Sequence, residues 1–242
     1  LRSMFKEECS IENNAYFSIL KYKLYIGRKK SIYFLNKAIE AVSKNNIKIK
    51  NPNLPNDHDK AAKTLSKKII ALLHFGRSGT GLLHSLIDNH SEVTTLPSYY
   101  FGQFFESPTW EKITHDGWSN IIDNFIDSYP VLFDSRSSHP VATKQKFIEN
   151  MGIKEGMTTL GNKKNEFLYL DKTLFKEELN NLISKYEFLD QITFFRLIHE
   201  AYEKTIKSSQ EKNILFYHIH NPQDYALLNF INSAPHTKWL IM

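Results

Sequence analysis

Apolar and polar positions alternate differently in the first part of the chain and in the remainder. Up to about Asn46 the apolar side chains recur every three or four positions, which is the spacing of helices with one buried face. Two such stripes are present: Phe17, Leu20 and Leu24, and then Ile32, Leu35, Ile39 and Val42. We therefore expect a helical segment over residues 1–50. A linker over residues 51–66, which begins Asn-Pro-Asn-Leu-Pro-Asn-Asp, separates it from the rest.

From residue 67 onward, short apolar runs alternate with helical stripes. Residues 69–75 form a nearly continuous apolar run, typical of a strand that is buried on both faces of a parallel sheet. Further strands are expected at 92–96, 214–219 and 239–242, and helices at 118–129, 175–186, 192–206 and 225–232. This alternation predicts an α/β domain over residues 67–242, built as a three-layer sandwich in which helices flank a parallel sheet.

The strand expected at 69–75 runs into a glycine-rich turn, residues 76–81, and then into a helix. The apolar stripe of this helix consists of Leu82, Leu83, Leu86 and Ile87. A strand, a tight glycine turn and a helix start together form an anion site, because unpaired backbone N–H groups and the positive end of the helix dipole converge there. The natural anion for such a site is a phosphate.

Residues 76–81 match the first six positions of the Walker pattern, G-x-x-x-x-G-K-[ST]. Residues 82–83 are both leucine, so the turn lacks the lysine that reaches the β/γ-phosphates and the hydroxyl that holds magnesium. This pattern argues against a nucleoside triphosphatase. The positive charge lies earlier, on Arg77, beside the hydroxyls of Ser78 and Thr80. That arrangement suits a ligand with one phosphate in the turn and a transferable anionic group next to the guanidinium.

Residues 76–83, which read Gly-Arg-Ser-Gly-Thr-Gly-Leu-Leu, together with residues 86–93, resemble the 5′-phosphosulfate loop of sulfotransferases. That loop typically reads P-[RK]-S-G-T-T-L-L and precedes a leucine-rich helix and D-x-H-P-E-V. The chain departs from it at Gly76, Gly81 and Ser91, which replace a Pro, a Thr and a Pro. The resemblance implies a P-loop-like fold, 3′-phosphoadenosine 5′-phosphosulfate (PAPS) as the donor, and sulfuryl transfer to a hydroxyl or amine with no metal.

A second landmark of the family is matched near the end of the chain. The family typically carries K-T-P after a strand, and residues 220–222 of this chain are His-Asn-Pro. Before the next strand the family carries FP-x-A-K-x-I, which residues 234–240 resemble. The family's arginine and serine for the 3′-phosphate would lie beyond Met242, so we expect the domain at 67–242 to be C-terminally incomplete. Because tetratricopeptide-like repeats precede some sulfotransferase domains, residues 1–50 are either the end of such an array or a helical layer on the domain.

The resemblance also implies roles for individual residues. The donor would be bound by Gly76, Arg77, Ser78, Gly79, Thr80, Gly81 and Leu82. Arg77 is the expected catalytic cation, because a planar guanidinium bridges the leaving phosphate oxygen and the sulfuryl group. The acceptor base is open among Glu106, His139 and His220. His220 would end a parallel strand, where such sheets place their sites, although its family counterpart is a lysine on the donor side.

Composition narrows the classes of function. The formal net charge of +5 over 242 residues suits an anionic nucleotide, and it is too small and too dispersed to indicate nucleic-acid binding. The single cysteine, Cys9, excludes an intrachain disulfide and gives no sign of a thiolate metal cluster.

No apolar run approaches the length of a transmembrane helix, and the start shows no signal-peptide pattern, so the default expectation is a cytoplasmic chain. Leu1 and Met242 look like cut ends, which reduces the weight of a missing signal.

Two other functions stay open at this stage. A small-molecule kinase with a degenerate phosphate loop accounts for the glycine turn, but the leucines at 82–83 argue against it. A non-catalytic, sulfotransferase-like binding domain accounts for Gly81, for residues 220–222 and for the unlocated base. The acceptor is open among small molecules, carbohydrates and peptides. We expect at least half of the aromatic rings at 99–105 to be core, and the others to border the acceptor pocket.

Overall fold

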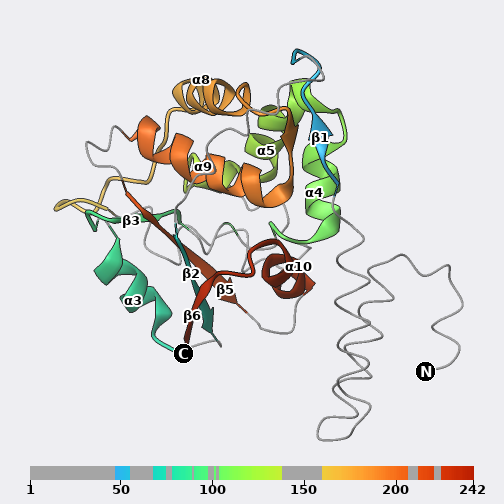
Figure 1. Cartoon of the computed structure of the whole chain (residues 1–242). Coiled ribbons are helices and arrows are strands. Elements are labelled where there is room, and N and C mark those ends of the chain that lie inside the picture. The colour runs from blue at the N-terminus through green and yellow to red at the C-terminus, as the bar shows by residue number, and fades with distance from the viewer. Residues whose placement is uncertain are drawn as a thin grey trace, which may run out of the picture.

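The computed structural model describes residues 47–54, 68–74, 78–88, 90–97, 101, 104–137, 160–206, 212–220 and 225–242. Residues 1–46 of the expected helical segment and residues 55–66 of the linker lie outside the described residues, whereas residues 49–50, at the end of that segment, form a strand and not a helix. The described part is an α/β structure in which helices flank a four-stranded parallel sheet, as the sequence predicts (Figure 1). None of the described helices combines the length and the apolar character needed to cross a membrane.

The parallel sheet is built from the four strands that the sequence predicts. They are β2 (Lys68–His74), β3 (Val93–Thr95), β5 (Ile214–His220) and β6 (Lys238–Ile241). Their spatial order is β3-β5-β2-β6. β2 pairs with β5 over its whole length, from Lys68 opposite Ile214 to His74 opposite His220. The apolar run at 69–73 is nearly continuous because β2 has a strand on each side and side-chain contacts on both of its faces.

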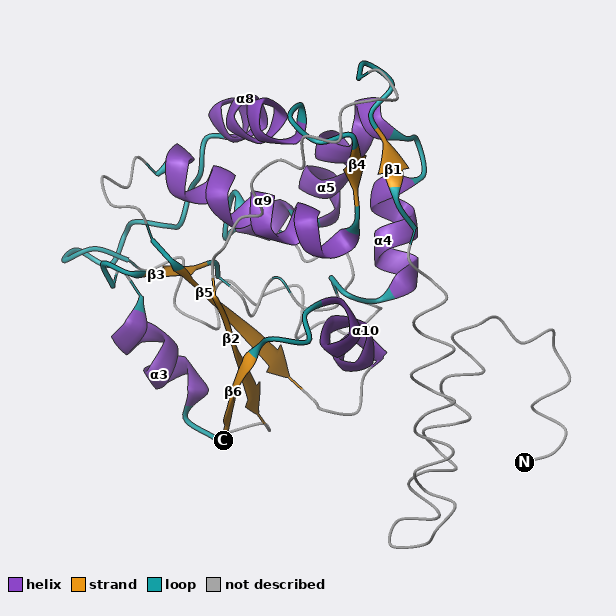
Figure 2. Ribbon diagram, in the orientation of Figure 1, coloured by secondary structure: helices purple, strands orange, loops and turns teal. Residues whose placement is uncertain are grey.

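Different helices cover the two faces of the sheet, and Figure 2 shows them on either side of the strands. These helices are α3 (Thr80–Ile87), α9 (Gln191–Thr205) and α10 (Tyr225–Ser233). The ring centroid of Tyr217 on β5 lies 5.1 Å from that of Phe195 on α9 and 5.3 Å from that of Phe230 on α10. The preceding residue, Phe216, has its ring centroid 6.2 Å from that of His84 on α3. Because consecutive strand residues point to opposite faces, α3 covers one face, and α9 and α10 the other.

More helices lie beyond α9 (Figure 1). The hydrophobic core that they share with α9 and the sheet is rich in aromatic side chains. The outer elements are α4 (Ser107–Thr114), α5 (Ile121–Ser128), α8 (Lys172–Ile183) and the 3₁₀ turns η2 (Trp118–Asn120) and η3 (Pro130–Leu132). A short strand β1 (Ile49–Lys50) pairs antiparallel with β4 (Phe188–Leu189). Phe101, Phe104 and Phe105 are each 0% exposed, so these three rings of the aromatic segment belong to the core.

A buried ion pair joins α9 to the amino end of β5. The Nζ atom of Lys212 lies 3.0 Å from a carboxylate oxygen of Glu203, and both side chains are buried. The hydroxyl of Thr94, on β3, donates a hydrogen bond of 2.6 Å to the same carboxylate. The lysine and the carboxylate compensate each other's charge in a largely buried place, so the loss of the cation leaves a buried charge uncompensated.

We expect the substitution Lys212→Met to lower the free energy of unfolding by about 3–5 kcal/mol, because it leaves the Glu203 carboxylate buried without its cation. Lys204→Met is the matched control, since Lys204 is 42% exposed and its nitrogen is 4.0 Å from the Glu200 carboxylate. The control is expected to change stability by less than about 0.5 kcal/mol. Urea titration of both variants measures the difference, and equal losses would contradict a special role for the buried pair.

Candidate functional site

The carboxyl ends of β2 and β5 meet at one edge of the sheet. The backbone of His74, the last residue of β2, lies opposite that of His220, the last residue of β5. β2 continues through α3 to β3 on one flank of the sheet, whereas β5 continues through α10 to β6 on the other flank. Ligands of open parallel sheets bind at the carboxyl edge where adjacent strands send their connections in opposite directions. The point between β2 and β5 meets this condition.

The helix that follows β2 begins at a glycine in a left-handed conformation. Gly79 is the N-cap of α3, with φ 79° and ψ 11°, and its carbonyl oxygen accepts hydrogen bonds from the N–H groups of Leu82 (3.1 Å) and Leu83 (3.2 Å). Only glycine adopts this conformation without strain. A methyl group added at Gly79 or at Gly81 would meet no atom within 4 Å. The helix start therefore combines N–H groups that have no intrahelical acceptor with open space beside both glycines.

Side-chain hydrogen bonds stabilise the turn that connects α3 to β3. The hydroxyl of Thr95, on β3, donates a hydrogen bond to the carboxylate of Asp88, and the ring nitrogen Nδ1 of His90 accepts one of 3.1 Å from the N–H of Glu92. Asp88 and His90 are the first two defined positions of the family's D-x-H-P-E-V tail. In this chain they hold the turn between α3 and β3, which is a structural role.

Three histidine rings lie together beneath α3, and the sequence analysis did not predict this cluster. His74 ends β2, His218 lies on β5 and His84 on α3. The Nδ1 atom of His84 and the Nε2 atom of His218 are joined by a hydrogen bond of 3.0 Å, and the ring centroids of His74 and His218 are 5.4 Å apart with the rings edge to face. The Oγ1 atom of Thr80 lies 3.4 Å from Nδ1 of His74, so the cluster reaches the first residue of α3. We call these three residues the histidine cluster.

Two rings of the histidine cluster, His84 and His218, have pKa values below that of a free imidazole. Burial lowers the pKa of His218 to about 3, with the neighbouring His84 and His74 rings as further causes. Burial also lowers the pKa of His84, against the opposing effect of the Asp88 carboxylate. Two neutral imidazoles can form the observed hydrogen bond because one ring nitrogen donates while the other accepts. Among the described residues, no three His, Cys, Asp or Glu side chains are arranged to hold a metal ion.

The structure describes some of the predicted site residues and not others. Ser78 to Leu82 lie at the start of α3, where the Leu82 side chain is 69% exposed. Gly76, Arg77 and His139 lie outside the described residues, and for His220 only the backbone position at the end of β5 is described. Glu106, the N-cap of α4, lies close enough to Tyr217 for its charge to add to the effect of burial, which raises the pKa of that tyrosine. The structure thus brings Ser78–Leu82 and the backbone of His220 to one edge, and it associates Glu106 with the face that α9 covers.

Comparisons of the chain with protein-family models, with curated proteins and with solved structures found no match. The likeness to sulfotransferases therefore rests on the motifs at residues 76–93 and 220–240.

We expect stability to fall as the pH drops from about 6.5 towards 3. His218 is neutral in the folded chain over this range, whereas in the unfolded chain it takes up a proton below its ordinary pKa of 6.5. The unfolded state then binds more protons than the folded state. Each such group lowers the free energy of unfolding by up to about 1.4 kcal/mol for every pH unit. Urea titrations between pH 4 and 8 should show a shallower acid decline for His218→Gln than for the parent chain. His236→Gln, at an exposed histidine in the turn before β6, should follow the parent; identical profiles for all three would contradict the assignment.

Substitution by alanine at the two glycines at the start of α3 should change the stability of the helix in opposite directions. Gly79→Ala is expected to destabilise α3 by about 1–2 kcal/mol, because an L side chain strains the left-handed conformation. Gly81→Ala should stabilise the helix by up to about 1 kcal/mol, because its new methyl group enters open space and the helical backbone loses less entropy. Amide hydrogen exchange across residues 80–88 measures both changes, and effects of the same sign would contradict the observed backbone conformation.

Proposed function

We propose that this protein is a sulfotransferase that moves a sulfuryl group from PAPS to a hydroxyl or amine acceptor, on a P-loop-like fold. One observation carries the proposal. The sulfotransferase-like motif at residues 76–83 falls between a central parallel strand and the start of a helix, beside the end of β5. A nucleotide's phosphate group is expected at this place in an open parallel sheet, on physical grounds that do not depend on the motif.

In the proposed complex the loop acts mainly through its backbone. The N–H groups of Gly79, Thr80 and Gly81 donate to oxygens of the phosphosulfate, and the left-handed Gly79 holds them in place before the ligand arrives. His74 helps to orient Thr80. When the Nδ1–H tautomer of His74 donates to the Thr80 hydroxyl oxygen, the hydroxyl hydrogen is left for the anion.

The proposed reaction is an in-line displacement at sulfur. The acceptor oxygen or nitrogen bonds to sulfur, the bond from sulfur to the 5′-phosphate oxygen breaks, and adenosine 3′,5′-bisphosphate leaves with the electron pair. The acceptor's proton passes to a base, for which His139, His220 and Glu106 are the candidates. Arg77 stabilises the charge that builds on the leaving oxygen and on the sulfuryl oxygens. No residue in this scheme requires a metal, in keeping with leucines at the two Walker positions that serve magnesium nucleotides.

Calorimetric titration of the full-length protein with adenosine 3′,5′-bisphosphate tests the proposal. We expect micromolar or tighter binding, and a loss of at least about tenfold with Arg77→Ala, which removes roughly 1.4 kcal/mol or more of charge-assisted hydrogen bonding. Arg136→Ala is the matched control, because the Arg136 guanidinium is 57% exposed and pairs with Asp134 at 2.7 Å. Absence of binding would overturn the proposal, and magnesium-dependent binding of ATP in its place would favour the kinase alternative.

A further inference from the structure

An open depression lies between α5, α8 and the turn that follows β1. Its volume is about 670 Å³, and α8 supplies one wall. The other walls come from the turn at Pro52–Asn53 and from Trp118 and Ser119 of η2 with Ile122 of α5. Figure 1 shows α8 at the end of the molecule opposite the carboxyl ends of β2 and β6. The depression is therefore separate from the candidate nucleotide site.

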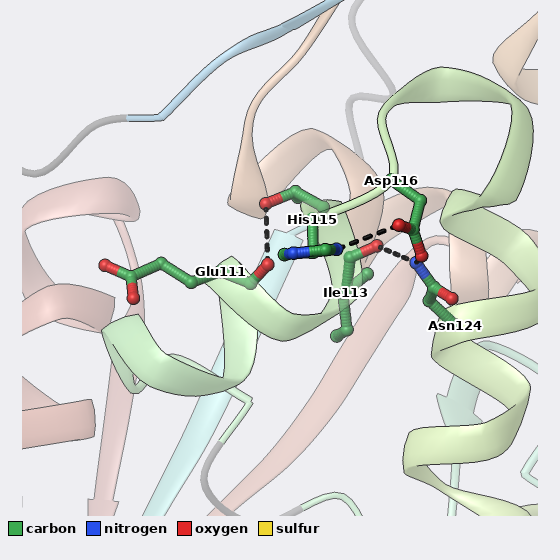
Figure 3. A network of polar contacts seen from close by, with 6 residues as sticks. Glu111, Ile113, His115, Asp116 and Asn124 are labelled. Carbon is green, nitrogen blue, oxygen red and sulfur yellow. Dashed lines mark hydrogen bonds and ion pairs between the residues drawn. The ribbon is translucent and has the colours of Figure 1, made fainter.

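A network of polar contacts between α4 and α5 lies just before Trp118 in the sequence (Figure 3). The side-chain amide of Asn124 donates hydrogen bonds to the carbonyl oxygen of Ile113 (3.2 Å) and to a carboxylate oxygen of Asp116 (3.3 Å). Gly117 then turns the chain with φ 75°, a conformation that favours glycine, and Trp118 follows directly. The indole packs against the core and stays partly exposed to the depression. Part of the Trp118 side chain therefore forms the wall of the depression.

The opposite wall is fixed by a buried asparagine. The side-chain amide of Asn51 donates a hydrogen bond of 3.2 Å to the carbonyl oxygen of Tyr186, and its backbone N–H donates one of 2.7 Å to that of Glu187. The side-chain oxygen of Asn51 accepts a hydrogen bond of 3.0 Å from the backbone N–H of Asn53. These bonds anchor the turn to the segment after α8. Asn53 therefore lines the depression from a preorganised backbone.

The charges of the depression disfavour an anionic ligand. Lys176, the cation on the wall, is bound to both carboxylate oxygens of Asp123 at 2.7 Å, so its charge is compensated. Glu177 adds a negative charge, which would repel phosphate groups. Within the described residues, the side-chain amides of Asn53 and Asn180 make no hydrogen bond to protein, and each amide offers a donor and an acceptor to a ligand.

We propose that this depression binds a neutral carbohydrate chain. The Trp118 indole offers an apolar surface on which the C–H face of a sugar ring can stack, and the amides of Asn53 and Asn180 offer paired donors and acceptors for neighbouring hydroxyls. The open shape suits several linked sugar units. A peptide would be recognised by an unpaired strand edge or by a long apolar groove, and walls formed by helix sides and one turn provide neither. This proposal does not depend on the sulfotransferase assignment.

Titration of the full-length protein with neutral tetra- to hexasaccharides of glucose, mannose, galactose or N-acetylglucosamine tests the site. We expect at least one oligosaccharide to bind, and Trp118→Ala to weaken that binding by about tenfold or more, with Trp239→Phe on β6 as the matched control. Asn180→Ala, on the exposed surface of α8, should weaken binding by about threefold or more without loss of the fold. Arg77→Ala should leave it unchanged, which distinguishes this site from the nucleotide site.

Thermal unfolding of each variant shows whether a loss of binding reflects a loss of structure. If Trp118→Ala is unfolded, Asn180→Ala decides the outcome. The proposal is overturned if no sugar of the panel binds, if binding is the same in the Asn180 variant as in the parent, or if the depression binds peptides in preference to these sugars.

Discussion

The in-register pairing of β2 with β5 is the constraint on which the rest of the structure depends. The pairing runs from Lys68 opposite Ile214 to His74 opposite His220 without interruption. Because side chains alternate along each strand, this register sends Tyr217 to the aromatic core under α9 and sends His218 to the face under α3. A shift of one strand by one residue would exchange the two sets of side chains and place imidazoles in the aromatic core. The same pairing therefore determines the core, the histidine cluster and the edge at which the glycine turn emerges.

The strands and helices with long apolar runs or stripes could be predicted because each carries one dominant pattern. The strand expected at 214–219 is β5 (Ile214–His220), and the helix expected at 175–186 is α8 (Lys172–Ile183). α4 (Ser107–Thr114) was not expected. Its buried large apolar residues are Trp110 and Ile113 alone, which are too few to show a helical period, and its position depends on tertiary contacts such as the hydrogen bond from the Trp110 indole to the carbonyl oxygen of Ile47.

The candidate site could be predicted only where it is local in the sequence. The left-handed Gly79 and the helix start at Thr80 follow from a glycine turn between a strand and an amphipathic helix. The contact between His84 and His218 could not be predicted in this way, because it joins residues 134 positions apart through the order and register of the sheet. One signal was available in the sequence: the histidines His74 and His218 occur in two apolar runs that were expected to be parallel strands. If those runs are neighbours, their alternation places both rings on one face.

The hydrogen bond between His84 and His218 has no fixed polarity. Either ring can supply the shared hydrogen, and a reversal requires each imidazole to exchange its tautomer while the heavy atoms stay where they are. His84 is partly buried, whereas His218 is buried. A change in what His84 meets at its outer nitrogen can thus invert the donor and acceptor pattern of a ring inside the protein, without any movement of the backbone.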